Sequence, residues 1–173
     1  MALALDAIFI NGTVGAGKTT VAHAIGSMES GPHAVIDLDA IRTFGPSSDE
    51  DPFNHELELA NLKSLSDNYR KAGATRFVLA GVIEDATNIP RYVSALGSRG
   101  LFLCRLTASE DALSGRLAER HQAEPDELAW HLARARQLTR ILDEQALDDI
   151  VIDSSERSPT DLAAQIRSAA GWT

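Results

Sequence analysis

The chain has 173 residues, 44% of them hydrophobic, a composition that suits one compact domain with a single core. Its formal net charge of −9 and its pI of about 4.9 disfavour a nucleic-acid backbone or an anionic membrane as partner, because both need a basic surface. Its single cysteine, Cys104, excludes a disulfide within the chain and suits a reducing compartment. We expect one cytoplasmic domain over residues 1–173.

The first apolar segment, Leu5 to Ile10, leads into a run that matches the phosphate-loop pattern G-x-x-x-x-G-K-[ST] from Gly12 to Thr19. In such a loop, backbone N–H groups turn toward nucleotide phosphates, and the following helix presents its positive end to them. Lys18 is expected to reach the outer phosphates, and the Thr19 hydroxyl to ligate Mg²⁺. The predicted nucleotide contacts are Gly12, Thr13, Val14, Gly15, Ala16, Gly17, Lys18, Thr19 and Thr20.

The rest of the chain alternates between short apolar runs and helical patterns. Four further runs have the continuous apolar character of buried parallel strands: residues 33–36, 77–83, 101–106 and 150–152. Capped helical patterns occupy residues 51–73, 107–120, 125–142 and 158–171. This alternation predicts an α/β fold in which a five-stranded parallel sheet is covered by helices on both faces.

Two carboxylates follow the second apolar run, in Asp37-Leu38-Asp39. Residues two apart in an extended chain point the same way, so both are expected to enter the crevice where parallel α/β sheets bind ligands. Phosphoryl transfer needs Mg²⁺ at the phosphates and a carboxylate that orients the attacking hydroxyl, and two acids can divide those tasks. The alternative is that one or both only cap a helix that begins near Ala40. Arg42 is a candidate acceptor contact or, alternatively, a solvated surface arginine.

These motifs and the order of elements resemble the small-molecule kinases of the phosphate-loop superfamily, which include shikimate, gluconate and adenylylsulfate kinases and chloramphenicol phosphotransferase. The run from Asp37 to Arg42 is similar to their D-G-D-x-x-R, with Leu38 in place of the glycine. The resemblance implies a three-layer fold with strand order 2-3-1-4-5, a mobile lid over about residues 116–127, and ATP with Mg²⁺ as cofactors. It also implies that Asp39 contacts the acceptor hydroxyl and that Asp37 lies nearer the metal.

Arginines in and after the predicted lid are candidates for nucleotide contacts. Arg116 and Arg120 are placed on one face of a helix by their spacing. The resemblance to shikimate kinase-like enzymes implies that Arg116 stacks on adenine opposite Pro159, and that Arg120 touches the phosphates. On the next helix, Arg134 is expected to face the transferring phosphate or the substrate. The alternative for each arginine is an ion pair on a solvated face.

The remaining candidate site residues are supported by less sequence evidence. Glu84 follows the third apolar run and is expected to enter the same crevice as a metal or substrate contact. The five histidines show no metal-ligand spacing and are interpreted as structural or solvated. Trp130 and Trp172 are interpreted as packing residues rather than as a binding cage.

The sequence favours an ATP-dependent kinase that transfers the γ-phosphate to a hydroxyl of a small molecule. Its expected catalytic residues are Lys18, Asp39, Arg120 and Arg134, and its expected acceptor contacts are Asp39, Arg42 and Glu84. The alternatives are a nucleotide-monophosphate or nucleic-acid-end kinase, and a nucleotide-binding regulator with slow ATP hydrolysis. No motif identifies the acceptor. We expect no nucleic-acid or membrane partner, and either a monomer or a homodimer.

Overall fold

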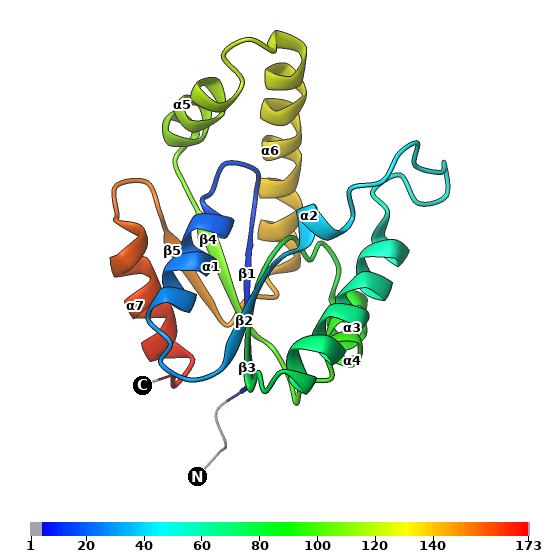
Figure 1. Cartoon of the computed structure of the whole chain (residues 1–173). Helices are drawn as coiled ribbons and strands as arrows, with labels where there is room; N and C mark the ends of the chain where they lie inside the picture. Colours follow the sequence, from blue (N-terminus) through cyan, green and yellow to red (C-terminus); the bar gives the residue numbers. More distant parts are fainter. Residues whose placement is uncertain (1–4, 173) are drawn as a thin grey trace.

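A parallel sheet of five strands forms the centre of the structure, a computed structural model that describes residues 5–172 (Figure 1). The strands are β1 (Ala7–Gly12), β2 (His33–Asp37), β3 (Arg76–Ala80), β4 (Phe102–Thr107) and β5 (Ile150–Asp153). Their order across the sheet is β2-β3-β1-β4-β5, and every neighbouring pair is parallel. The predicted α/β fold and its strand order 2-3-1-4-5 are confirmed.

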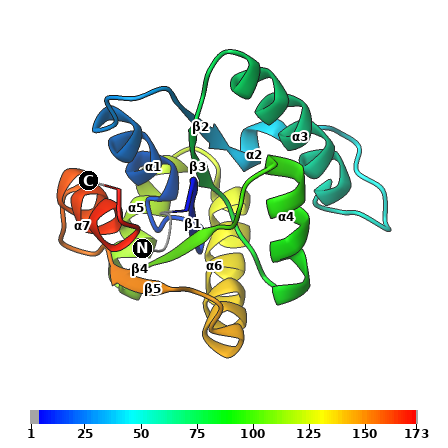
Figure 2. The same cartoon turned by 90° about the horizontal axis from the view of Figure 1, so that it is seen from below.

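Helices cover both faces of this sheet, so its strands are buried on both sides (Figure 2). The helical elements are α1 (Lys18–Ser27), α2 (Leu38–Ile41), α3 (His55–Lys71), the 3-10 turn η1 (Ala86–Asn88), α4 (Ile89–Leu96), α5 (Glu110–Arg120), α6 (Pro125–Gln145) and α7 (Pro159–Ala169). Ile8 and Ile10 of β1 face a core formed with α1 and α7, whereas Ala7 and Phe9 face a second core formed with α3 and α4. The alternation along β1 thus explains its uninterrupted apolar run.

Two helix starts differ from the prediction. Thr107 is the last residue of β4, and α5 begins after Ser109, whose hydroxyl accepts a backbone N–H of the first turn. The helix predicted from Asp51-Pro52 begins later, at His55. Asp51 still serves it, because its carboxylate accepts the backbone N–H of His55 at 2.7 Å. A side chain several residues before a helix can therefore cap its N-terminus, although the helix itself begins later.

The helix α4 was not among the predicted elements. It has Pro90 in its first turn and ends before Gly97, which has a φ of 63° in the left-handed region. Tyr92 and Leu96 lie one turn apart and are both buried. These signals are typical of a helix, but α4 has only 8 residues, too few for a clear periodic pattern.

Two further observations bear on the expectations from composition. The thiol of Cys104 is buried, and burial raises its pKa to about 12, as expected of an inert cysteine. Over residues 5–172, no helix has the length and apolar character needed to cross a membrane.

Candidate nucleotide and acceptor site

The loop between β1 and α1 has the backbone that a phosphate loop requires. Gly17, at the N-cap of α1, has a φ of 93°, a backbone conformation that residues with a side chain rarely adopt. A Cβ on Gly12 would lie 2.6 Å from the carbonyl oxygen of Leu106 in β4. Among the residues that the structure describes, no side chain caps α1. Its first N–H groups therefore remain available for an anion.

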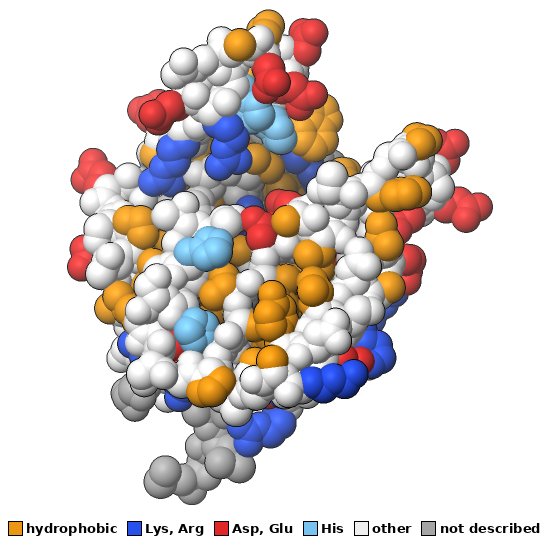
Figure 3. All heavy atoms as spheres, in the orientation of Figure 1, with side chains coloured by type: hydrophobic (Ala, Val, Ile, Leu, Met, Phe, Trp, Pro, Cys, Tyr) orange, Lys and Arg blue, Asp and Glu red, His pale blue; other side chains and the backbone are white. Residues whose placement is uncertain are grey.

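The loop opens on a cavity of about 500 Å³ at the carboxyl end of the sheet. Figure 3 shows this face hollowed below α5 and α6, with basic side chains along the upper rim. Of the predicted nucleotide contacts, Val14, Gly15, Gly17, Lys18, Thr19 and Thr20 line the cavity. Gly12, Thr13 and Ala16 are buried instead, and the Thr13 hydroxyl donates to the carbonyl of Ala135 in α6 at 3.0 Å. These three support the loop rather than face the cavity.

Lys18 reaches back along the loop, where its Nζ donates to the carbonyl oxygen of Thr13 at 2.9 Å. Burial lowers the pKa of Lys18 to about 8, while the carboxylates of Asp39 and then Asp37 act to raise it. The structure therefore brings the predicted lysine and both predicted acids into one electrostatic environment.

The two carboxylate oxygens of Asp37 make different contacts. Its Oδ1 accepts the backbone N–H of Asp39 at 3.0 Å and caps α2, as the alternative interpretation proposed. Its Oδ2 accepts the hydroxyl of Thr19 at 2.9 Å. The two residues predicted to hold Mg²⁺ are thus in contact, and both offer the oxygen ligands that this ion prefers. Within the described chain, no group of three or more His, Cys, Asp or Glu residues is arranged to hold a metal.

The geometric argument for Asp39 was wrong, although the residue lines the cavity. The chain is already helical at Leu38, so Asp39 lies in the first turn of α2 rather than on an extended strand. Leu38 is buried against Gly81, where an added Cβ would lie 2.5 Å from Leu38 Cδ1. The leucine that replaces the glycine of the resembling kinases therefore packs on a glycine after β3.

A buried carboxylate that sequence reasoning missed lies behind Asp39. Arg42 pairs with Asp39 and also places its Nη1 3.2 Å from Oε2 of Glu58 in α3, a side chain only 2% exposed. The hydroxyl of Tyr92 donates to Glu58 as well. Burial raises the pKa of Glu58 overall, although the Tyr92 hydrogen bond and the charge of Arg42 act to lower it. Arg42 is therefore a paired residue of the site and not a solvated arginine.

Glu84 and Arg134 form a second ion pair on the cavity wall. β3 ends at Ala80, so Glu84 lies in the following loop and not at a strand end as predicted. The Arg134 guanidinium also lies 4.9 Å from the centre of the Phe53 ring. Arg136, its neighbour on α6, instead pairs with Glu110 outside the cavity.

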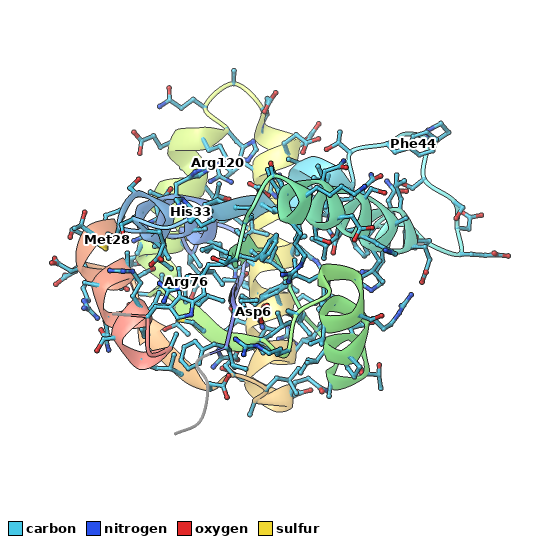
Figure 4. The ribbon with its side chains drawn as sticks, turned by 60° about the horizontal axis from the view of Figure 1, so that its bottom comes forward. Asp6, Met28, His33, Phe44, Arg76 and Arg120 are labelled. Atoms are coloured by element: carbon cyan, nitrogen blue, oxygen red, sulfur yellow. The ribbon has the colours of Figure 1, made fainter. Side chains whose placement is uncertain are left out.

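The two arginines of the predicted lid, both on α5, have different surroundings. Arg120 lines the cavity and is labelled on the α5 side of the molecule in Figure 4. Arg116 does not line it. Its Nη2 donates to the carbonyl of Ser154 at 2.7 Å, and its Nη1 donates to the carbonyl of Gly15 at 3.2 Å. Pro159 is exposed at the start of α7. The adenine contact of Arg116 and Pro159 stays a prediction.

Aromatic and imidazole side chains complete the cavity. Trp172 is buried as expected, but the interpretation of Trp130 as a packing residue was wrong, because it is 52% exposed and lines the cavity. His55 and His131 line it too, and the His131 ring stacks on that of His121 with centroids 4.5 Å apart. Their positions on α3 and α6, far apart in sequence, explain why no spacing pattern pointed to them.

A family model described as an AAA domain matches residues 8–154. No curated protein shows significant sequence similarity to the chain. Among solved structures, a tunicamycin resistance protein from Deinococcus radiodurans is 22% identical with a TM-score of 0.65, over 96% of each chain. A gluconokinase from Sinorhizobium meliloti is 18% identical with a TM-score of 0.63, over 95% of this chain and 91% of that one. A shikimate kinase from Acinetobacter baumannii, in complex with shikimate, is 17% identical with a TM-score of 0.60, over 94% and 90%.

At these identities the likeness to solved structures concerns the fold. The family model adds a match over most of the chain, including the phosphate loop and the end of β5. The resemblance that the motifs indicated is therefore confirmed: the chain belongs to the AAA domain family and has the fold of the P-loop small-molecule kinases.

Proposed function

We propose that this protein is an ATP-dependent kinase that transfers the γ-phosphate to a hydroxyl group of a small molecule. One observation carries the proposal: the phosphate loop and Asp39 line the same cavity. A carboxylate that shares a cavity with a phosphate loop can orient an acceptor hydroxyl and accept its proton. A cavity of about 500 Å³ suits a small acceptor beside the terminal phosphate.

On the nucleotide side, the phosphates lie against the N–H groups of the loop and the start of α1. Lys18 and Arg120 supply positive charge toward the outer phosphates. Thr19 and Asp37, in contact at 2.9 Å, would hold Mg²⁺. When bound, this ion would neutralise negative charge that develops on the phosphates during transfer.

On the acceptor side, Asp39 takes the proton of the hydroxyl as its oxygen attacks the γ-phosphorus. Arg42 restrains the Asp39 carboxylate, and Glu58 in turn restrains Arg42. The acid is thus oriented by an ion-pair chain anchored in α3, which agrees with the precision that group transfer requires.

Release of ADP from Mg-ATP, measured across a panel of hydroxylated small molecules, tests the proposal. We expect at least one acceptor to raise the rate about tenfold or more above basal hydrolysis, and Lys18→Ala to abolish the increase. Arg136→Ala, which removes an ion pair outside the cavity, serves as the matched control and should retain the increase. Slow hydrolysis that no acceptor stimulates would instead favour a nucleotide-binding regulator.

A further inference from the structure

The arginines on the acceptor side of the cavity already have carboxylate partners. Arg42 pairs with Asp39 and with Glu58, whose side chain is only 2% exposed. An anionic substrate that binds Arg42 would have to separate it from a carboxylate that water hardly reaches. Such a separation is unfavourable, because it leaves a buried charge without compensation.

Arg134 also has a carboxylate partner, although this one is 36% exposed. It pairs with Glu84, and its Nη1 donates to Oε1 of Gln137 at 2.7 Å. Its side chain is 12% exposed, and its guanidinium lies over the Phe53 ring. The charge of Arg134 and its two terminal nitrogens are thus already engaged by Glu84 and Gln137.

The other two cations of the cavity wall belong to the nucleotide side. Lys18 is part of the phosphate loop, and Arg120 ends α5 above it. Arg120 makes no ion pair with any residue between 5 and 172, so its charge remains for the triphosphate. The acceptor half of the cavity therefore offers no uncompensated positive charge within the described chain.

The same half has apolar walls. Phe53 and Trp130 are 45% and 52% exposed, and both line the cavity together with Val82 and Leu138. Aromatic rings beside a cavity offer a flat apolar surface that favours planar groups.

We propose that the acceptor is an uncharged alcohol that carries a planar apolar group, an inference that rests on the proposed kinase function. Its hydroxyl lies at Asp39, and its planar group lies against Phe53 and Trp130. The reaction forms a bond between the alcohol oxygen and the γ-phosphorus and breaks the bond from that phosphorus to the β–γ bridging oxygen. The hydroxyl proton passes to Asp39, and ADP leaves.

A matched pair of probes tests the charge preference: 4-(hydroxymethyl)benzamide and 4-(hydroxymethyl)benzoate have nearly the same shape and differ in charge. Calorimetric titration of the whole protein, with and without a non-hydrolysable ATP analogue, gives both dissociation constants. We expect the amide to bind at least about tenfold more tightly than the benzoate. Equal binding, tighter binding of the benzoate, or binding of neither compound would overturn the inference.

Variants that free one arginine show whether ion pairing sets this preference. Glu84→Gln leaves Arg134 without its carboxylate and should shift the ratio of the two dissociation constants about tenfold toward the benzoate. Glu110→Gln frees Arg136 outside the cavity and should leave the ratio unchanged. An unchanged ratio in Glu84→Gln would contradict the role given to this pair.

The aromatic wall is tested separately. Trp130→Ala and Phe53→Ala should each weaken binding of the amide about fivefold or more, whereas Phe44→Ala should not, because Phe44 is 64% exposed but lies outside this cavity. Figure 4 shows Phe44 on the projecting loop that precedes α3. Amide binding that survives both wall variants would overturn the planar part of the inference.

The acceptor inference and the kinase proposal fail in different ways. If the protein does not bind the ATP analogue, the kinase proposal fails, while titrations without nucleotide still measure the preference for the amide. If the protein binds the ATP analogue and prefers the benzoate, only the acceptor inference fails.

Discussion

The guanidinium of Arg42 lies 3.2 Å from the buried carboxylate of Glu58 and also pairs with the cavity residue Asp39. The chain of charges runs from the core side of α3 to the first turn of α2. Tyr92 of α4 donates its hydroxyl to the same glutamate. This buried contact thereby restrains the arginine that pairs with Asp39 on the cavity wall.

Glu58→Gln should lower kcat about tenfold and leave the Kd for ATP unchanged, because it loosens Arg42 and thus Asp39 without touching the phosphate loop. The glutamine can still accept the Tyr92 hydroxyl. Breaking a fully buried pair costs about 3–5 kcal/mol, but Arg42 is 28% exposed and keeps Asp39, so we expect about 1–2 kcal/mol of lost stability in urea unfolding.

Glu56→Gln is the matched control for this variant. Glu56 lies on the surface of α3, like Glu58 a residue of its first turns, and is 69% exposed. The substitution removes its ion pair with Arg91 of α4. It should cost less than about 1 kcal/mol and leave kcat unchanged. Equal effects of Glu56→Gln and Glu58→Gln on kcat would show that Glu58 does not position the site.

The paired acids should respond differently to substitution. Asp39→Asn removes the proposed proton acceptor and should abolish transfer while the Kd for Mg-ATP stays about the same. Asp37→Asn changes the partner of Thr19 and should raise the Mg²⁺ concentration needed for half-maximal rate. Magnesium titrations and nucleotide Kd values that are identical for the two variants would contradict this division of roles.

Arg116→Ala and Arg120→Ala should separate affinity from turnover. Loss of Arg116 removes the predicted adenine contact and its bond to the Gly15 carbonyl, and we expect ATP binding to weaken by about 1–2 kcal/mol with less effect on kcat. Loss of Arg120 should lower kcat more than affinity, because we propose that this residue meets charge that develops during transfer. An Arg116→Ala protein with unchanged Kd for ATP would refute the adenine contact.

The stability of the core should depend on pH through Glu29. Burial raises the pKa of this carboxyl, but hydrogen bonds from Arg76 and Arg167, at 2.5 and 2.7 Å, outweigh burial and lower it overall. A carboxyl whose pKa is lower in the folded protein stabilises it above its unfolded pKa, and this contribution is lost as the pH falls through the folded pKa.

Urea unfolding of Glu29→Gln checks this linkage. At pH 7 the variant should be less stable by about 1–2 kcal/mol, since its arginine partners remain half-buried without the charge they pair with. The difference should shrink in acid, below the usual carboxyl range, where the natural glutamate is also neutral. A difference that stays constant from pH 7 into this range would contradict the account.

Local signals were sufficient to predict the sheet and the nucleotide side of the cavity. The strands are short buried runs, and the phosphate loop is one continuous motif in which Lys18 and Thr19 have fixed places. Asp37 ends β2 and Asp39 follows two residues later, so the topology of a parallel sheet placed both at the carboxyl end of the sheet, where Asp39 lines the cavity. Even the strand order followed from the resemblance that these motifs carried.

The acceptor side depends on contacts between distant segments, which no local pattern reveals. Glu58 lies in the charged first turns of α3, where the sequence alone suggests a surface residue. In the structure it is buried by its contacts with Arg42 and Tyr92. Trp130 lies on α6, where it is 52% exposed and lines the cavity rather than the core. Tertiary packing, rather than propensity, decided both positions.

Transfer of labelled γ-phosphate from ATP to an added alcohol tests the central claim most directly. With the natural protein, the label should appear on the alcohol faster than as inorganic phosphate. Lys18→Ala should lose about 3 kcal/mol of transition-state stabilisation, which lowers the rate of transfer roughly a hundredfold. Label that appears only as inorganic phosphate with every alcohol tested, or a Lys18→Ala protein that transfers within about threefold of the natural rate, would contradict the assignment of this cavity as a kinase active site.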